Sequence, residues 1–147
     1  MTVRLSGPRR RGSLPAVDRR LLRQRAARLL AALGCEGAEL SLALADDEEI
    51  AALNARFRDK PGPTDVLSFS LLEGAHPERR GALLGDVVMG VEVAARQAAR
   101  AGRGLDEELA RLLIHGVLHL LGHDHEQPAP AARMRAEERR LWRTLRT

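Results

Sequence analysis

The chain is 147 residues long, and 44% of its residues are hydrophobic, 30% are charged and only 2% are aromatic. A chain of this length buries enough surface for one core and too little for two, so we expect a single domain over residues 1–147. Two phenylalanines and one tryptophan are the whole aromatic supply, which leaves few rings on which bases could stack. Any binding of nucleic acid must therefore depend mainly on arginine and backbone groups.

The sequence predicts neither a membrane segment nor an export signal. No apolar run approaches the roughly 18–20 residues of a membrane span, and residues 1–15 lack the apolar core of a signal peptide. Cys35 is the only cysteine and cannot form an intramolecular disulfide, which is typical of a reducing compartment. We therefore expect a soluble cytoplasmic protein without a membrane partner.

The net charge of +4 is unevenly distributed along the chain. Residues 1–34 contain nine arginines and one acid, whereas residues 35–147 contain 15 basic and 19 acidic groups. The arginines of the first segment could neutralise phosphates, or they could form a solvated helix face behind a frayed basic terminus at residues 1–12. Lys60 is the only lysine beside 23 arginines, which indicates a codon bias. The arginine count alone is therefore no sign of nucleic-acid recognition.

The first quarter of the chain predicts a strand, a turn and a helix. Residues 2–5 are expected to form a short strand, and residues 6–12 a polar turn rich in glycine, proline and arginine. The helix is expected to begin near Ser13 or Pro15, because serine can cap a helix and proline is tolerated in its first turn, and to end at Gly34. Its expected apolar stripe consists of Val17, Leu21, Leu22, Ala26, Leu29, Leu30 and Leu33.

Apolar alternation over residues 39–44 predicts a second strand with one face in the core. The acids at residues 46–49 then stand where a helix N-terminus favours negative charge, which predicts a short helix. Its expected apolar positions are Ile50, Leu53 and Phe57. Two prolines and a glycine at residues 61–63 exclude regular structure and so end this helix. Residues 66–70 and 83–89 predict two further strands, and antiparallel pairing is possible around the loop at residues 73–82.

Three more helices are expected in the second half of the chain. Residues 91–100 predict a helix that ends at glycines 102 and 104, and Asp106 is expected to cap the next helix. That helix is apolar nearly all round, so we expect it to be central. Residues 127–130 are expected to form a linker, and a final charged helix should begin at Ala131. Together these elements predict an α+β fold, a small mixed sheet of about four strands packed with about five helices.

Four of the five histidines lie within residues 115–125, at the end of the expected central helix. His115 and His119 are four residues apart and share one face of a helix. A helix commonly ends through a left-handed glycine, so a turn at Gly122 can deliver His125 to the same point. Three neutral imidazoles suit zinc and leave a fourth position for water, although nickel or cobalt would also accept them. The sequence predicts a metal site; the alternative is a buried helix that happens to carry histidines.

Gly116 separates this segment from the zinc proteases that share its spacing. The pattern H-x-x-x-H-x-x-G-x-x-H is that of the metzincins, which carry a glutamate as general base directly after the first histidine. Gly116 has no side chain to accept a proton, so peptide hydrolysis by that mechanism is not expected. Glycine inside a helix costs roughly 1 kcal/mol relative to alanine, which indicates either close packing or the approach of a substrate.

The segment HGVLHLLGHDH at residues 115–125 resembles the signature of the YbeY family of metal-dependent bacterial endoribonucleases. Two further stretches are similar to the same family, residues 53–58 leading to residues 63–69, and residues 84–87. The family usually has proline after Ser-Phe, where this chain has Ser70. The N-terminal arginine segment and the tail after Gln127 match no motif of the family that we can name.

The resemblance implies a small α+β domain that cleaves single-stranded RNA rather than DNA. It further implies maturation of 16S rRNA at its 3′ end, ribosome quality control, and the ribosome with its associated proteins as partners. The metal that it implies is one Zn²⁺ held by His115, His119 and His125. Arg58 matches the arginine that the family has near its metal cleft.

Three side chains are candidate catalytic residues. Arg58 could offer its planar guanidinium to a phosphate, or it could pair with a nearby acid. His115 is a candidate both as ligand and as catalytic residue. Asp124 could accept a ligand's ring N–H or act as general base, or it could cap backbone N–H groups as an ordinary loop carboxylate. The acids that could pair with Arg58 are Asp59, Asp65 and Asp86. Further residues that could line the cleft are Thr64, Asp65 and Ser68. His76 and His123 are expected to be noncatalytic.

The leading hypothesis is therefore a zinc-dependent endoribonuclease specific for single-stranded RNA. One alternative is a metal-dependent amidase or protease that uses the same three histidines, against which the missing glutamate at position 116 argues. A second alternative is a noncatalytic ribosome-assembly factor, in which the metal only stabilises the fold and the basic N-terminus binds rRNA.

Overall fold

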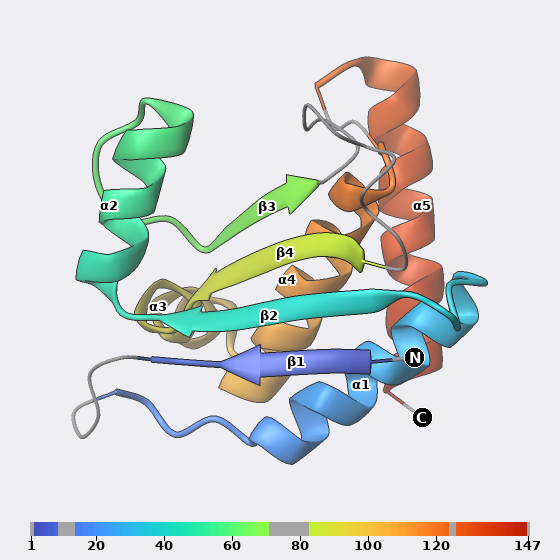
Figure 1. Ribbon diagram of the computed structural model, residues 1–147, viewed down its shortest axis with the longest axis horizontal. Helices are drawn as coiled ribbons and strands as arrows, with labels where there is room; N and C mark the ends of the chain where they lie inside the picture. The colour runs from blue at the N-terminus through green and yellow to red at the C-terminus, as the bar shows by residue number, and fades with distance from the viewer. Residues whose placement is uncertain (1, 9–13, 71–82, 124–125, 147) are drawn as a thin grey trace.

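A computed structural model describes residues 2–8, 14–70, 83–123 and 126–146 of the chain. Within these ranges four strands form one mixed sheet in the order β1-β2-β4-β3 (Figure 1). Strand β2 pairs in parallel with both β1 and β4, whereas β3 pairs with β4 in the antiparallel direction. The expected antiparallel pairing on either side of residues 71–82 is thus confirmed. The strands are β1 (Thr2–Ser6), β2 (Glu39–Ala45), β3 (Val66–Ser70) and β4 (Leu83–Gly90).

Five helices accompany the sheet within the same ranges, so the predicted α+β fold is confirmed. They are α1 (Arg19–Ala32), α2 (Asp47–Arg58), α3 (Val91–Ala101), α4 (Leu105–Leu120) and α5 (Pro128–Leu145). None of these helices combines the length and the apolar character that a membrane crossing would need.

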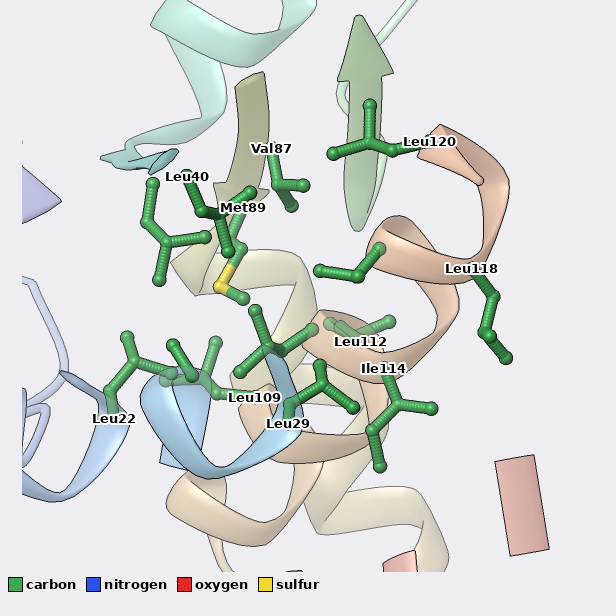
Figure 2. Packing of buried hydrophobic residues seen from close by; sticks show 14 of the residues in the cluster. Leu22, Leu29, Leu40, Val87, Met89, Leu109, Leu112, Ile114, Leu118 and Leu120 are labelled. Carbon is green, nitrogen blue, oxygen red and sulfur yellow. The ribbon is translucent and has the colours of Figure 1, made fainter. Parts of the chain in front are cut away.

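The two faces of the sheet carry two separate clusters of buried residues. Successive residues of a strand point to opposite faces, so Leu40, Leu42 and Leu44 pack on one side of β2 with α1, α3, α4 and α5. Figure 2 shows Leu40, Val87 and Met89 of the sheet on the side where labelled leucines of α1 and α4 lie. On the other side, Ala45 packs with Ile50 of the single helix α2.

Helix α4 is central, as expected from its nearly continuous apolar sequence. Ten of its 16 residues are buried, and it contacts α1, α3, α5, β3 and β4. Gly116 lies where α4 crosses the sheet most closely. A Cβ atom there would lie 2.9 Å from Val87 Cγ1, 3.1 Å from Ser68 Oγ and 3.3 Å from Val66 Cγ2. Of the two explanations offered for this glycine, close packing is thus observed.

Two of the expected helix starts were wrong. Helix α1 begins at Arg19 and not near Pro15, because the Asp18 carboxylate accepts a hydrogen bond from Leu21 N at 3.0 Å and so caps the helix; Ser13 lies outside the described residues. Helix α5 begins at Pro128, so the linker expected at residues 127–130 is its first turn. Proline at the first position of a helix loses no intrahelical hydrogen bond, which makes it a start signal here.

Two other residues take roles that differ from those expected. Asp106 lies in the first turn of α4 behind the cap residue Gly104, and its carboxylate accepts a hydrogen bond from Asp18 N at 3.1 Å. It therefore links the starts of α1 and α4 instead of capping its own helix. Phe57, expected among the apolar positions of α2, is 50% exposed, although its ring packs edge to face against Phe69 of the edge strand β3 at a centroid distance of 5.5 Å.

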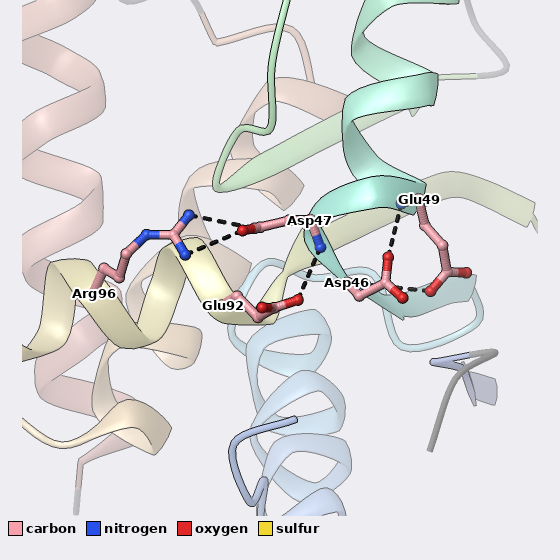
Figure 3. Close-up of polar contacts among 5 residues, drawn as sticks. All are labelled: Asp46, Asp47, Glu49, Glu92 and Arg96. Carbon is pink, nitrogen blue, oxygen red and sulfur yellow. Dashed lines mark hydrogen bonds and ion pairs between the residues drawn. The ribbon is translucent and has the colours of Figure 1, made fainter. Parts of the chain in front are cut away.

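The start of α2 is held by a network of carboxylates (Figure 3). Asp46 accepts a hydrogen bond from Glu49 N at 2.8 Å, and Glu49 accepts one from Asp46 N at 3.2 Å, which together form a capping box. Asp47 N donates to Glu92 of α3, and the Asp47 carboxylate pairs with Arg96 at 3.1 Å. These contacts anchor α2 at one end, and Arg58 is presented at the other.

The packing at Gly116 predicts that Gly116→Ala destabilises the protein. Alanine should gain about 1 kcal/mol of helix propensity, but overpacking against the stiff Val87 side chain typically costs about 1–3 kcal/mol. We expect a net loss of about 1 kcal/mol in the free energy of unfolding, measured by urea denaturation. Gly37→Ala is the control, because a Cβ there meets no atom within 4 Å. Equal or greater stability of Gly116→Ala would contradict the packing argument.

Candidate functional site

His115 and His119 lie one turn apart on α4, and their imidazoles face each other. The two Nε2 atoms are 3.1 Å apart, and the ring centroids are 4.6 Å apart with the rings edge to face. Both side chains are half-buried at the wall of a cleft. The i, i+4 spacing thus brings the two nitrogens together, as expected.

This separation fits two ligands of one metal ion. With Zn–N bonds of about 2.0–2.1 Å and tetrahedral angles, two ligand nitrogens lie about 3.3 Å apart. A hydrogen bond between one protonated and one bare ring nitrogen also has this length. Among the described residues no cluster of three histidine, cysteine or acidic side chains suited to a metal is found. The third expected ligand, His125, and Asp124 lie outside the described residues.

The C-terminus of α4 has the conformation expected before a third ligand. Gly122 has φ of 93°, in the left-handed region, and its N–H donates to His119 O at 3.0 Å. His123 N donates to Leu118 O at 3.0 Å, which completes a Schellman motif. The helix therefore ends at Leu120, and the chain turns at Gly122, as the sequence predicts.

Glu138 of α5 contacts the other side of the His115 ring, a contact that sequence reasoning missed. Its Oε2 lies 3.2 Å from His115 Nδ1, and both side chains are 31% exposed. A carboxylate at this nitrogen favours the tautomer in which Nδ1 carries the proton and Nε2 is free. The sequence held a signal, because Glu138 stands four residues after Met134 and three before Leu141, within the apolar stripe of α5.

A cleft of about 520 Å³ runs past the two histidines. Its walls come from four parts of the chain, namely α2, the loop that follows it, β3 and α4, together with Glu126. Arg58 and Lys60 bring positive charge to the cleft, and Asp65 and Glu126 bring negative charge. The residues that line it are Asn54, Arg58, Lys60, Thr64, Asp65, Val66, Leu67, Ser68, Ser70, His115, His119, Leu120 and Glu126. The expected cleft residues Thr64, Asp65 and Ser68 are therefore all present.

Arg58 lies in the cleft without a carboxylate partner among the described residues, so the alternative in which it pairs with Asp59, Asp65 or Asp86 is not observed. One of its terminal nitrogens donates to Ser68 O, and the guanidinium lies 5.0 Å above the ring of Phe69. The bond to Ser68 also covers a backbone carbonyl of the edge strand β3. A guanidinium has five N–H donors, so Arg58 keeps donors available for a ligand in the cleft.

The loop between α2 and β3 is held rigidly beside the histidines. Asn54 is only 6% exposed, and its side-chain amide donates to Gly62 O at 3.0 Å. At the far end of the loop, Gly90 N donates to Asp65 O at 2.8 Å, and a Cβ atom on Gly90 would collide with Thr64 O. The sequence indicated a break in structure here, but it did not indicate these contacts.

Strand β3 is attached to α4 by a hydrogen bond at the closest point of approach. Ser68 Oγ donates to Gly116 O at 2.9 Å, directly beside His115. This bond fixes the register between the strand that carries the Arg58 acceptor and the helix that carries the two histidines.

Known proteins similar to this chain agree on one family. The family model Endoribonuclease YbeY matches residues 14–146, which includes the tail after Gln127 and the N-terminal segment from residue 14 onward, where no motif was named. Endoribonuclease YbeY of Anaeromyxobacter sp. (strain Fw109-5) is 52% identical over 143 residues, covering 97% of this chain and 71% of that protein. Endoribonuclease YbeY of Syntrophus aciditrophicus (strain SB) is 41% identical, covering 86% of this chain and 80% of that protein.

The fold also has a counterpart among solved structures. The solution structure of TM1509 from Thermotoga maritima matches with a TM-score of 0.65 at 24% sequence identity, covering 97% of this chain and 88% of that one. At this identity the likeness supports the fold alone. The matches of sequence to the family model and to its curated members decide the assignment: this chain belongs to the YbeY endoribonuclease family.

Proposed function

We propose that this chain is an endoribonuclease that cuts single-stranded RNA in the cleft beside His115 and His119. The observation that carries the proposal is the joint position of two facing imidazoles and the Arg58 guanidinium in one cleft. Family membership supports the same reaction, since the relatives are named endoribonucleases. By the resemblance we extend the proposal to 3′-end maturation of 16S rRNA and ribosome quality control, with ribosomal partners in the cytoplasm.

The proposed cofactor is one Zn²⁺ held by His115, His119 and His125. The distance between the first two nitrogens fits such a site, and the turn at Gly122 is compatible with the third ligand. When bound, the ion would lower the pKa of a water molecule towards about 7 and so supply a nucleophile at neutral pH. Glu138 would hold the His115 ring with Nε2 directed into the site.

The remaining catalytic roles fall to residues around the cleft. Arg58 would donate to a nonbridging phosphate oxygen and stabilise the negative charge that develops there. Lys60 adds a second cation to the same cleft. Asp124 stays a proposed catalytic residue, as proton acceptor or as a partner of a ligand ring.

A protease of the metzincin kind is disfavoured by the packing at position 116. A glutamate there needs a Cβ atom, which would lie 2.9 Å from Val87 Cγ1 on this backbone. The general base of that mechanism therefore has no room where α4 lies on the sheet.

RNA cleavage should depend on the facing histidines. We expect His119→Ala to lose at least about 100-fold in cleavage of a defined single-stranded RNA, because a ligand and the order of the site are lost together. The measurement is a gel assay with labelled RNA beside the metal content of each preparation. His76→Ala, a histidine outside the 115–125 segment, serves as control and should cut like the wild type. Undiminished cleavage by His119→Ala, or after chelation, would refute the metal-dependent proposal.

Glu138 should contribute to metal affinity. Loss of a carboxylate that orients a ligand histidine typically costs about 10–100-fold in affinity, so we expect Glu138→Ala to weaken zinc binding by that factor. Competition with a chromophoric chelator measures it. The neighbouring variant Glu137→Ala is a matched control, because the Glu137 carboxylate pairs with Arg140 at 2.6 Å, whereas the carboxylate at His115 is that of Glu138. The role of Glu138 is disproved if both variants bind zinc as tightly as the wild type.

Removal of the Arg58 side chain should lower the rate of RNA cleavage without lowering the stability of the fold. Arg58→Ala should lower kcat by about 100-fold, the usual effect of losing one donor to a developing charge. Its melting temperature should stay close to that of the wild type, because the side chain is exposed. Arg56→Ala removes a second exposed arginine of α2 that does not line the cleft, and should cut normally. If the two variants lose activity equally, general charge and not Arg58 explains the effect.

A further inference from the structure

A second groove, of about 310 Å³, lies between α4 and α5, and its lining is dominated by arginine. Arg111 of α4, two arginines of α5 and the arginine that caps the end of α5 contribute to it. The last three are Arg139, Arg143 and the C-cap residue Arg146, which has helical backbone angles, and their spacing of four and three residues places them on one face. The groove is therefore strongly basic.

Arg139, Arg143 and Arg146 are exposed and have no ion-pair partner within the described part of the chain. Arg111 differs, because it pairs with Glu107 at 3.1 Å. Like charges four residues apart, such as Arg139 and Arg143, repel each other and destabilise a helix. An uncompensated row of this kind is what an anionic ligand would neutralise, whereas a solvated helix face usually alternates its charges.

The ring in this groove is poorly suited to stack on a base. Trp142 lines the groove, but Arg25 lies 5.5 Å and Arg111 4.9 Å from the centroid of its ring. These guanidiniums already occupy the positions that a stacked base would need. The groove therefore offers charge without a stacking platform, which suits phosphate groups and gives no means of reading sequence.

The groove and the histidine cleft share a wall. Glu138 lines the groove and lies 3.2 Å from His115 Nδ1, while His115 lines the cleft. The groove that holds Arg139, Arg143 and Arg146 therefore adjoins the cleft at the contact between His115 and Glu138. In Figure 1, α5 runs beside α4 away from this point along the edge of the molecule.

We propose that Arg139, Arg143 and Arg146 form a phosphate-binding track for the RNA strand outside the cleavage cleft. The inference rests on the proposed function, because it takes single-stranded RNA as the ligand of the cleft. The track binds the backbone independently of sequence and raises the affinity of long RNAs over short ones.

The experiment measures binding by fluorescence anisotropy at several salt concentrations, with labelled 2′-O-methyl RNAs that keep their phosphates and a gel to confirm that they stay intact. For single strands the slope of log affinity against log salt is about −0.7 for each phosphate neutralised. The triple variant Arg139→Gln, Arg143→Gln, Arg146→Gln should therefore reduce the slope for a long RNA by roughly 2. An oligonucleotide short enough to fill only the cleft should bind the triple variant as it binds the wild type.

Matched variants separate this track from general charge. Arg143→Gln should reduce the slope by about 0.7, whereas Arg100→Gln, which removes an exposed arginine of α3, should leave it unchanged. The triple lysine variant, which keeps the charges, should retain the slope. An unchanged slope in the triple glutamine variant, or equal effects of Arg143→Gln and Arg100→Gln, would overturn the proposal. These readouts need no cleavage, so a failure of the catalytic proposal is detected separately in the His119→Ala assay.

Discussion

The close contact of Gly116 with β3 and β4 is the constraint on which the site depends. Only a residue without a Cβ lets α4 approach Val87 and Val66 this closely, and the same residue accepts the hydrogen bond of Ser68. Because His115 is its neighbour in the sequence and His119 follows one turn later, the packing of the helix sets the position of both imidazoles. A change in how α4 packs on the sheet would therefore also move the two imidazoles, because a close-packed interior transmits such shifts.

The cleft is assembled from segments that are distant in sequence and held by different means. Helix α2 is anchored by its capping box and by its contacts with α3, and its other end presents Arg58. The loop after it is held by the buried Asn54. Glu138 reaches His115 from α5, more than 20 residues farther along the chain. Such rigid support matters because ligand and donor groups act only when they are held in position before the reaction.

The elements were predicted well where the pattern was long and periodic, and poorly where a single residue decided a boundary. The alternating leucines of β2 and the apolar sequence of α4 gave the correct type and place of each element. Helix starts depended on which of several polar residues captured a backbone N–H, and Asp18 was chosen over the earlier candidates. Phe57 was expected in the core because helical spacing does not reveal that this residue packs on an edge strand, where half of its surface stays exposed.

The sequence by itself determined the pair of facing imidazoles and the turn that follows them, because residues four apart on a helix and a glycine at its end are local features. It also determined the α+β class and the family to which the chain is similar. Tertiary structure alone decided that Glu138 meets His115, that Arg58 bonds to Ser68 and not to an acid, and that three arginines in and directly after α5 face a groove beside the cleft. The physical reason is that these contacts depend on how separate elements pack, and packing is set by side-chain volumes distributed over the whole chain.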